Sequence, residues 1–208
     1  MRPFWEVTGL TYLIANALEL LGLFSGLLCV WLLIRQNVLT FPIGLIYAIV
    51  TVVVVARADL FADVLLNVYY VLMNAYGWYF WVYGGQERRR TQGLSVAWTP
   101  TSQRWALAAL IVVGTVAMGA FFSSQTSASL PYPDSFTTVA SFAAMWMSAR
   151  KYLESWILWF VIDVVQVVLY LIKGIEAYAL LYLVYLVMAF YGWKSWRVTM
   201  KQHPPALS

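Results

Sequence analysis

Apolar and polar positions follow one another along this chain in long blocks rather than in short alternation. Seven apolar stretches approach the roughly 20 residues that a helix needs to cross the hydrocarbon core of a bilayer. They lie at residues 12–34, 38–56, 60–83, 105–122, 135–149, 153–172 and 176–196. Lys and Arg residues gather at the ends of these stretches and between them. The pattern predicts an all-α integral membrane protein with seven transmembrane helices and the lipid bilayer as its surroundings.

The composition supports this class and argues against several others. Of the 208 residues, 62% are apolar and 11% are charged, whereas about a quarter of the residues in a soluble domain are charged. One Cys (Cys29) and one His (His203) favour neither a disulfide framework nor a metal site nor histidine catalysis. We therefore expect no enzyme, no catalytic residue, no bound metal and no cofactor. The net charge of +4 comes from short basic stretches beside apolar runs, which does not indicate nucleic-acid binding.

The distribution of basic residues between the loops predicts the orientation. With seven spans, ten of the 13 Lys and Arg residues fall on one side of the membrane and three on the other. Basic residues are enriched in cytoplasmic loops. The sequence thus predicts an N-terminus outside the cell and a cytoplasmic C-terminus.

Two segments of the chain resemble each other at a fixed offset of 115 residues. Residues 31–81 match residues 146–196 at 14 of 51 positions, and Tyr76-Gly77-Trp78 falls on Tyr191-Gly192-Trp193. Shared Trp, Tyr and Gly residues at one offset favour a duplication over chance similarity between apolar segments.

The repeat predicts the architecture of the whole chain. Two three-helix units in the same orientation need an odd number of spans between them, and the fourth stretch supplies one. This 3+1+3 arrangement of parallel repeats is similar to that of the sugar-transporting SWEET proteins, with the substrate near mid-membrane between the repeats. We expect the first repeat at residues 1–83, the linker with the fourth helix at 84–130, and the second repeat with the tail at 131–208.

Polar and aromatic side chains share one face of the sixth stretch. Trp156, Trp159, Asp163 and Gln166 recur at steps of three and four residues, which places them on one side of a helix. A carboxylate within a span is costly unless it faces a cavity or a partner, so Asp163 is a candidate functional residue. The alternative is a structural hydrogen bond between helices.

The third stretch shows a similar face, formed by Asn67, Tyr70 and Asn74. Ser141 in the fifth stretch and Tyr185 in the seventh are weaker candidates. Together these side chains favour a small planar substrate, neutral or cationic, that carries hydroxyl groups, because Trp and Tyr stack on such rings and attract positive charge. Without a Gly-rich loop that could cradle phosphate, we expect an unphosphorylated ligand.

Three motifs resemble the PnuC family of bacterial vitamin transporters. They are the glycine-spaced segment from Glu19 to Cys29, the Asn74-Ala-Tyr76-Gly77-Trp78 segment that ends at Trp81, and Arg150-Lys151-Tyr152-x-Glu154-x-Trp156-x-Leu-Trp159 followed by Asp163. The resemblance extends from about Asn16 to Trp196.

The resemblance implies uptake of nicotinamide riboside, a precursor of NAD, by facilitated diffusion across the bacterial inner membrane. A cytoplasmic kinase would trap the product by phosphorylation. It also implies that substrate contacts come from the Trp156–Trp159 face and the flanking spans. Asp163 stands where nicotinamide riboside transporters often carry Asn, so thiamine and riboflavin stay open as substrates. An ion-coupled symporter that uses Asp163 or Glu19 for protons is a further alternative, and a homo-oligomer is an open option.

Overall fold

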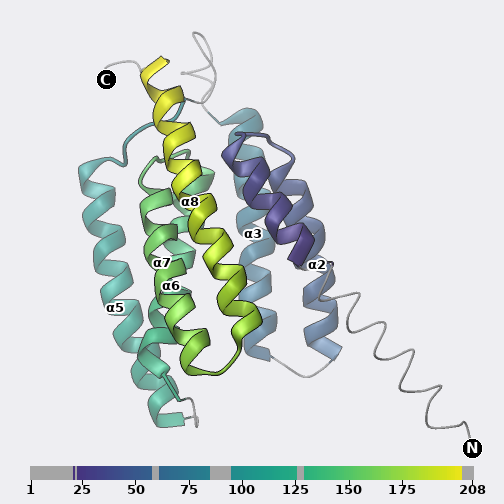
Figure 1. The fold of residues 1–208 in the computed structure, drawn as a ribbon, viewed down its shortest axis with the longest axis vertical. Coiled ribbons are helices and arrows are strands. Elements are labelled where there is room, and N and C mark those ends of the chain that lie inside the picture. Colours follow the sequence, from purple (N-terminus) through teal and green to yellow (C-terminus); the bar gives the residue numbers. More distant parts are fainter. Residues whose placement is uncertain (1–20, 22, 58–60, 85–94, 126–128, 203–208) are drawn as a thin grey trace, which may run out of the picture. The chain divides into compact units, whose positions relative to one another are not determined.

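A computed structural model describes residues 21, 23–57, 61–84, 95–125 and 129–202. Seven helical segments occur in these ranges (Figure 1): Leu23–Ile34, α2 (Thr40–Arg57), α3 (Phe61–Tyr83), α5 (Thr101–Gln125), α6 (Pro131–Ala149), α7 (Ser155–Ile172) and α8 (Glu176–Gln202). The described residues form no strand beyond one isolated bridge between Ala97 and Tyr152. The predicted all-helical class is confirmed, and α5, α7 and α8 are each long and apolar enough to cross a membrane.

Two helices begin earlier than the apolar pattern predicts. The fifth apolar stretch, at about residues 135–149, is extended at its start in the structure, because α6 begins at Pro131 and includes Asp134 in its first turn. Proline suits a first helical turn because that turn needs no backbone N–H donor, and an acid there interacts well with the helix dipole. Similarly, α5 begins at Thr101 with a polar turn before its apolar run.

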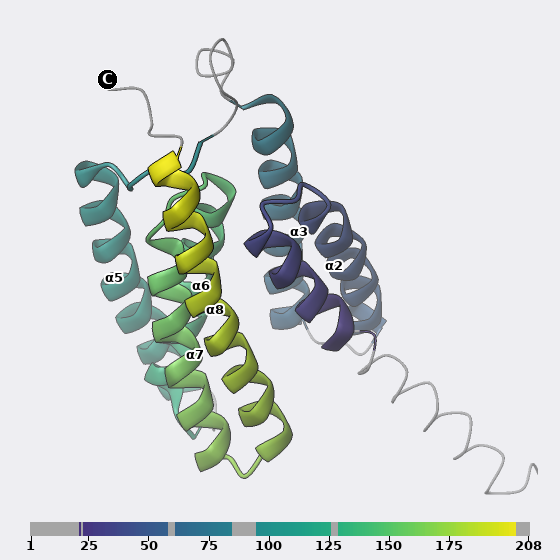
Figure 2. The ribbon, with the colours of Figure 1, turned by 45° about the horizontal axis from the view of Figure 1, so that its top comes forward.

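The chain divides within α3 into two compact units, residues 1–75 and residues 76–208. In the second unit, α5 packs on α6, α6 on α7, and α7 on α8 (Figure 2). The buried core of this unit contains Ala140, Ala144 and Ile162. Small residues on α6 let neighbouring backbones approach closely, which is how helices associate in the absence of water.

Local structure recurs along the chain at the 115-residue offset seen in the sequence. Both ends of α2 and α7, and the starts of α3 and α8, differ by that number. The turns before α2 and α7 share left-handed residues at equivalent positions, Gln36 with φ of 53° and Lys151 with φ of 55°.

The hydrogen bonds of these two turns also correspond. In the turn before α2, the backbone N–H of Gln36 donates to the Leu33 carbonyl and that of Asn37 to the Leu32 carbonyl, both at 2.9 Å. In the turn before α7, the N–H of Lys151 donates to the Ser148 carbonyl at 3.0 Å and that of Tyr152 to the Met147 carbonyl at 2.9 Å. This pair of bonds closes a helix through a left-handed residue. The Arg35 guanidinium lies 5.2 Å from the ring centroid of Trp31, and that of Arg150 lies 5.4 Å from Trp146. The two turns therefore have the same backbone hydrogen-bond pattern, and each is accompanied by an equivalent Arg–Trp cation–π contact.

Candidate substrate-binding faces

The face predicted on the sixth span lies on α7, in the second unit. Trp156 and Asp163 are buried, with 2% and 4% of their surface exposed, and Trp159 and Gln166 are partly buried. Trp159 packs against the Ala140–Ala144–Ile162 core, and its Nε1 donates to Ser148 Oγ on α6 at 3.1 Å. The Trp159 ring is thus held by both packing and a hydrogen bond.

Trp156 is fixed between α7 and α8. Its ring meets Trp196 edge to face, with 5.4 Å between centroids, and lies directly over Gly192. A Cβ atom at Gly192 would come within 2.4 Å of Trp156 Cε3, so the indole needs a glycine there. Among the described residues, Trp156 Nε1 and the neighbouring Ser155 Oγ are buried without a hydrogen-bond partner. A buried donor without an acceptor costs about 1–3 kcal/mol.

Asp163 lies one helical turn beyond Trp159. No described residue forms a hydrogen bond or ion pair with its carboxyl group. A lone acidic side chain at the centre of a membrane helix costs about 2.5–3.5 kcal/mol on insertion scales, so such residues generally serve a function. The structure therefore offers no internal partner in its described part that would account for Asp163.

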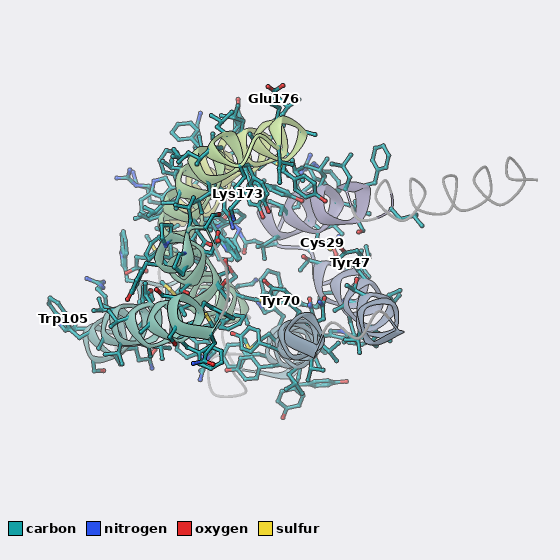
Figure 3. The ribbon with its side chains drawn as sticks, turned by 90° about the horizontal axis from the view of Figure 1, so that it is seen from below. Cys29, Tyr47, Tyr70, Trp105, Lys173 and Glu176 are labelled. Atoms are coloured by element: carbon teal, nitrogen blue, oxygen red, sulfur yellow. The ribbon has the colours of Figure 1, made fainter. Side chains whose placement is uncertain are left out.

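The second predicted face lies on α3, in the first unit. Asn67 and Asn74 are both buried, with 8% of their surface exposed. Asn74 Nδ2 donates to the carbonyl of Tyr70 at 2.8 Å, and the Tyr70 ring meets Tyr69 edge to face at 6.0 Å. Figure 3 shows Tyr70 of α3 and Tyr47 of α2 on neighbouring helices of this unit.

Ser141 and Tyr185 are less well suited to a ligand. Ser141 Oγ donates to the carbonyl of Thr137 on its own helix at 2.7 Å. Tyr185 meets Tyr182 edge to face at 5.8 Å, and Tyr182 in turn stacks on Tyr170 at 5.3 Å. Tyr185 therefore belongs to a tyrosine cluster between α7 and α8.

The nine predicted site residues divide between the two units. Asn67, Tyr70 and Asn74 lie in the first, and the six others lie in the second. Glu19, the alternative proton site, lies outside the described residues. In the described part of the chain, no three His, Cys, Asp or Glu side chains come together as metal ligands would.

Sequence reasoning missed a hydrogen-bond network beside the start of α7. The Glu154 carboxylate accepts bonds from Thr99 N and Thr99 Oγ1, both 2.9 Å, and from Arg104 Nη2 at 2.8 Å. The segment before α5 also pairs with the α6–α7 turn, because Ala97 N donates to Lys151 O and Leu153 N donates to Ala97 O. The sequence signal that could have pointed to this network is the position of Glu154 within the Arg150–Trp159 motif.

Comparisons with known proteins extend these observations. A family model described as nicotinamide mononucleotide transporter matches residues 16–198. The nicotinamide riboside transporter PnuC of Escherichia coli is 28% identical over 203 residues, covering 86% of this chain and 84% of that protein. The riboflavin/roseoflavin transporter RibM of Streptomyces davaonensis is 30% identical over 122 residues, covering 58% and 57%. A crystal structure of the vitamin B3 transporter PnuC shares the fold, with a TM-score of 0.69 and 22% identity over 95% of this chain and 88% of that one.

Proposed function

The chain belongs to the nicotinamide mononucleotide transporter family, and from this premise we propose that it carries nicotinamide riboside across the cell membrane. Its relatives are transporters rather than enzymes, and its apolar helices make it a multi-pass membrane protein. The observation that carries the choice of substrate is the α7 face, where two indoles accompany the carboxyl group of Asp163.

This face suits the chemistry of nicotinamide riboside. The substrate is a planar pyridinium that carries a positive charge, a carboxamide and ribose hydroxyls. Indole rings attract cations through their faces, by up to about 2 kcal/mol in a desolvated site. The amides of Asn67 and Asn74 offer both donors and acceptors for the carboxamide and hydroxyls. No Lys or Arg occurs between Ser155 and Ile172, so α7 provides no cation for a phosphate group.

The proposed substrate residues are the seven on the α3 and α7 faces together with Ser141 of α6 and Tyr185 of α8. They are Asn67, Tyr70, Asn74, Ser141, Trp156, Trp159, Asp163, Gln166 and Tyr185. Their contributions are unequal, because Ser141 already donates to Thr137 and Tyr185 belongs to the tyrosine cluster.

We further propose a 3+1+3 arrangement, with repeats at residues 1–83 and 131–208 and a linker at 84–130 that carries α5. The helix ends and turn hydrogen bonds that correspond at an offset of 115 residues support it. Rocking of the repeats about the site would move substrate down its gradient, and a cytoplasmic kinase would retain it as the phosphate. The basic loops support an outer N-terminus and a cytoplasmic C-terminus in the inner membrane.

Calorimetry on detergent-purified protein tests the substrate. Nicotinamide riboside should bind, while its phosphorylated form should not. Trp159→Ala should weaken binding at least about tenfold, since it removes the held ring. The matched control is Trp105→Ala, because Trp105 is 72% exposed on α5 and points away from the bundle (Figure 3). Equal affinity of wild type and Trp159→Ala would remove Trp159 from the site.

Riboflavin is the second candidate substrate, because the riboflavin transporter RibM matches 58% of the chain. Thiamine, whose cationic ring and amino group suit Asp163, is the third. Competition between the three vitamins for binding ranks them directly. Uptake into proteoliposomes that is unchanged by proton or sodium gradients would support facilitated diffusion, whereas dependence on either gradient would favour a symporter.

A further inference from the structure

Gly44 of α2 and Asn74 of α3 approach more closely than two ordinary side chains allow. A Cβ atom added at Gly44 would lie 2.4 Å from Asn74 Oδ1, 3.0 Å from Asn74 Cγ and 3.2 Å from Asn74 Nδ2. All three distances are shorter than van der Waals contact. The Asn74 amide therefore occupies the space that a side chain at position 44 would fill.

The amide has one fixed end and one available end. Asn74 Nδ2 is tied to the Tyr70 carbonyl one turn earlier on α3, at 2.8 Å. The oxygen, Asn74 Oδ1, accepts no hydrogen bond from any residue that the structure describes. A Cβ atom at position 44 would push this oxygen aside and strain the bond that fixes the nitrogen.

At the equivalent positions of the second repeat, the larger residue lies on the second helix and the smaller one on the third, the reverse of the first repeat. At the 115-residue offset, Gly44 corresponds to Trp159, and Asn74 corresponds to Ala189, which is buried. The first repeat thus has its small residue on the second helix and its polar residue on the third. The second repeat has its large residue on the second helix and its small residue on the third.

We propose that Gly44 is a positioning residue for the substrate, acting through Asn74. The missing side chain holds the Asn74 amide where its oxygen accepts a hydrogen bond from a hydroxyl or carboxamide of the substrate. At the 115-residue offset, the amide of the first repeat lies on α3 and the indole of the second repeat lies on α7. The inference rests on the proposed function, because it assigns Asn74 to the substrate.

A double-mutant cycle tests this inference. Gly44→Ala, Asn74→Ala and the double variant are compared with wild type by calorimetry with nicotinamide riboside and by unfolding in detergent. Gly44→Ala should weaken binding about tenfold, the effect of one lost hydrogen bond. In the Asn74→Ala background the same change should have almost no further effect on binding, and its cost to stability should shrink, because the clash is gone.

Gly119→Ala is the matched control. A Cβ atom at Gly119 would lie 2.4 Å from Tyr132 Cδ1, an equally tight contact between α5 and α6. This variant should lower stability and leave affinity unchanged. If Gly44→Ala does not fold, the double variant, which relieves the clash, should fold and bind like Asn74→Ala.

The outcomes separate this inference from the proposed function. If wild type binds nicotinamide riboside and Gly44→Ala binds equally well, the inference is overturned and the function stands. Additive losses in the double variant would also overturn it, because Gly44 would then act without Asn74. If wild type binds none of the vitamins, the proposed function fails, and the role of Gly44 and Asn74 in substrate binding fails with it. The stability measurements still test the Gly44–Asn74 contact, because coupled changes would show that it exists and additive changes that it does not.

Discussion

Replacing Glu154 by Ala is expected to destabilise the protein much more than removing its ion-pair partner Arg104. The Glu154 side chain is 16% exposed and accepts three hydrogen bonds, two from the buried Thr99 and one from Arg104. The Arg104 side chain is 54% exposed. The two kinds of partner therefore act in different surroundings, although the bond lengths are nearly equal.

The expected magnitudes follow from these surroundings. A hydrogen bond to a charged group contributes about 1.5–3 kcal/mol when it is shielded from water. Two such bonds from Thr99 place the cost of Glu154→Ala at roughly 3–6 kcal/mol. The ion pair is half in water, where such pairs contribute about 0–1 kcal/mol. Arg104 Nη2 also donates to the Thr99 carbonyl at 3.2 Å, so Arg104→Met should cost about 1–2 kcal/mol. Thr99→Val, which keeps the backbone donor, should cost roughly 1–2 kcal/mol.

Reversible unfolding in mixed micelles, followed by circular dichroism, measures these differences. Glu154→Gln is the informative control, because its amide oxygen can still accept from Thr99 while its charge is lost. It should fall between wild type and Glu154→Ala. An Arg104→Met variant as unstable as Glu154→Ala would refute the reasoning, since the ion pair rather than the Thr99 bonds would then hold the network together.

Two further predictions concern the turns that precede α2 and α7. Burial lowers the pKa of Lys151 to about 8 from the 10.5 of a free lysine, and its Nζ lies 4.3 Å from the Trp81 ring centroid. Between these values the unfolded chain holds a proton that the folded one has lost, so stability should rise with pH from about 8 to 10.5. Lys151→Gln should flatten that rise in a pH series of unfolding curves, and an unchanged slope would assign it to another group. Gln36 has a φ of 53°, so Gln36→Gly should raise stability by up to about 1 kcal/mol, whereas Gln36→Ala should give no gain. A stabilising Ala would show that the backbone is not strained there.

The helices were predictable because each follows from one local property, the length of an apolar run. Their ends were less so, as α6 shows. Its first turn contains Asp134, which the apolar pattern excludes, yet Pro131 starts a helix well and the acid suits its N-terminus. An apolar run locates the part of a helix that meets lipid and says little about polar turns at either end.

Contacts between distant segments were beyond sequence reasoning. The bonds from Thr99 to Glu154 join residues 55 positions apart, and no periodicity marks them. The left-handed turns at Gln36 and Lys151 were also missed, because neither position carries the glycine that usually signals one. By contrast, helical spacing alone decides that Trp156 and Asp163 lie on one side of α7, and both side chains are buried.

The two repeats are alike where the backbone must turn, and they differ at the positions proposed for the substrate except at Tyr70, which corresponds to Tyr185. Both turns keep the same backbone hydrogen bonds, because few backbone conformations can join two helices in this geometry. On the following helices, Gly44 corresponds to Trp159 and Ala48 to Asp163. A substrate with a charged ring at one end and a ribose at the other has no two-fold symmetry, so the side chains that each repeat offers to it need not match. Under the proposed function, the divergence belongs at positions that face the ligand, and the shared turns keep the geometry on which both faces depend.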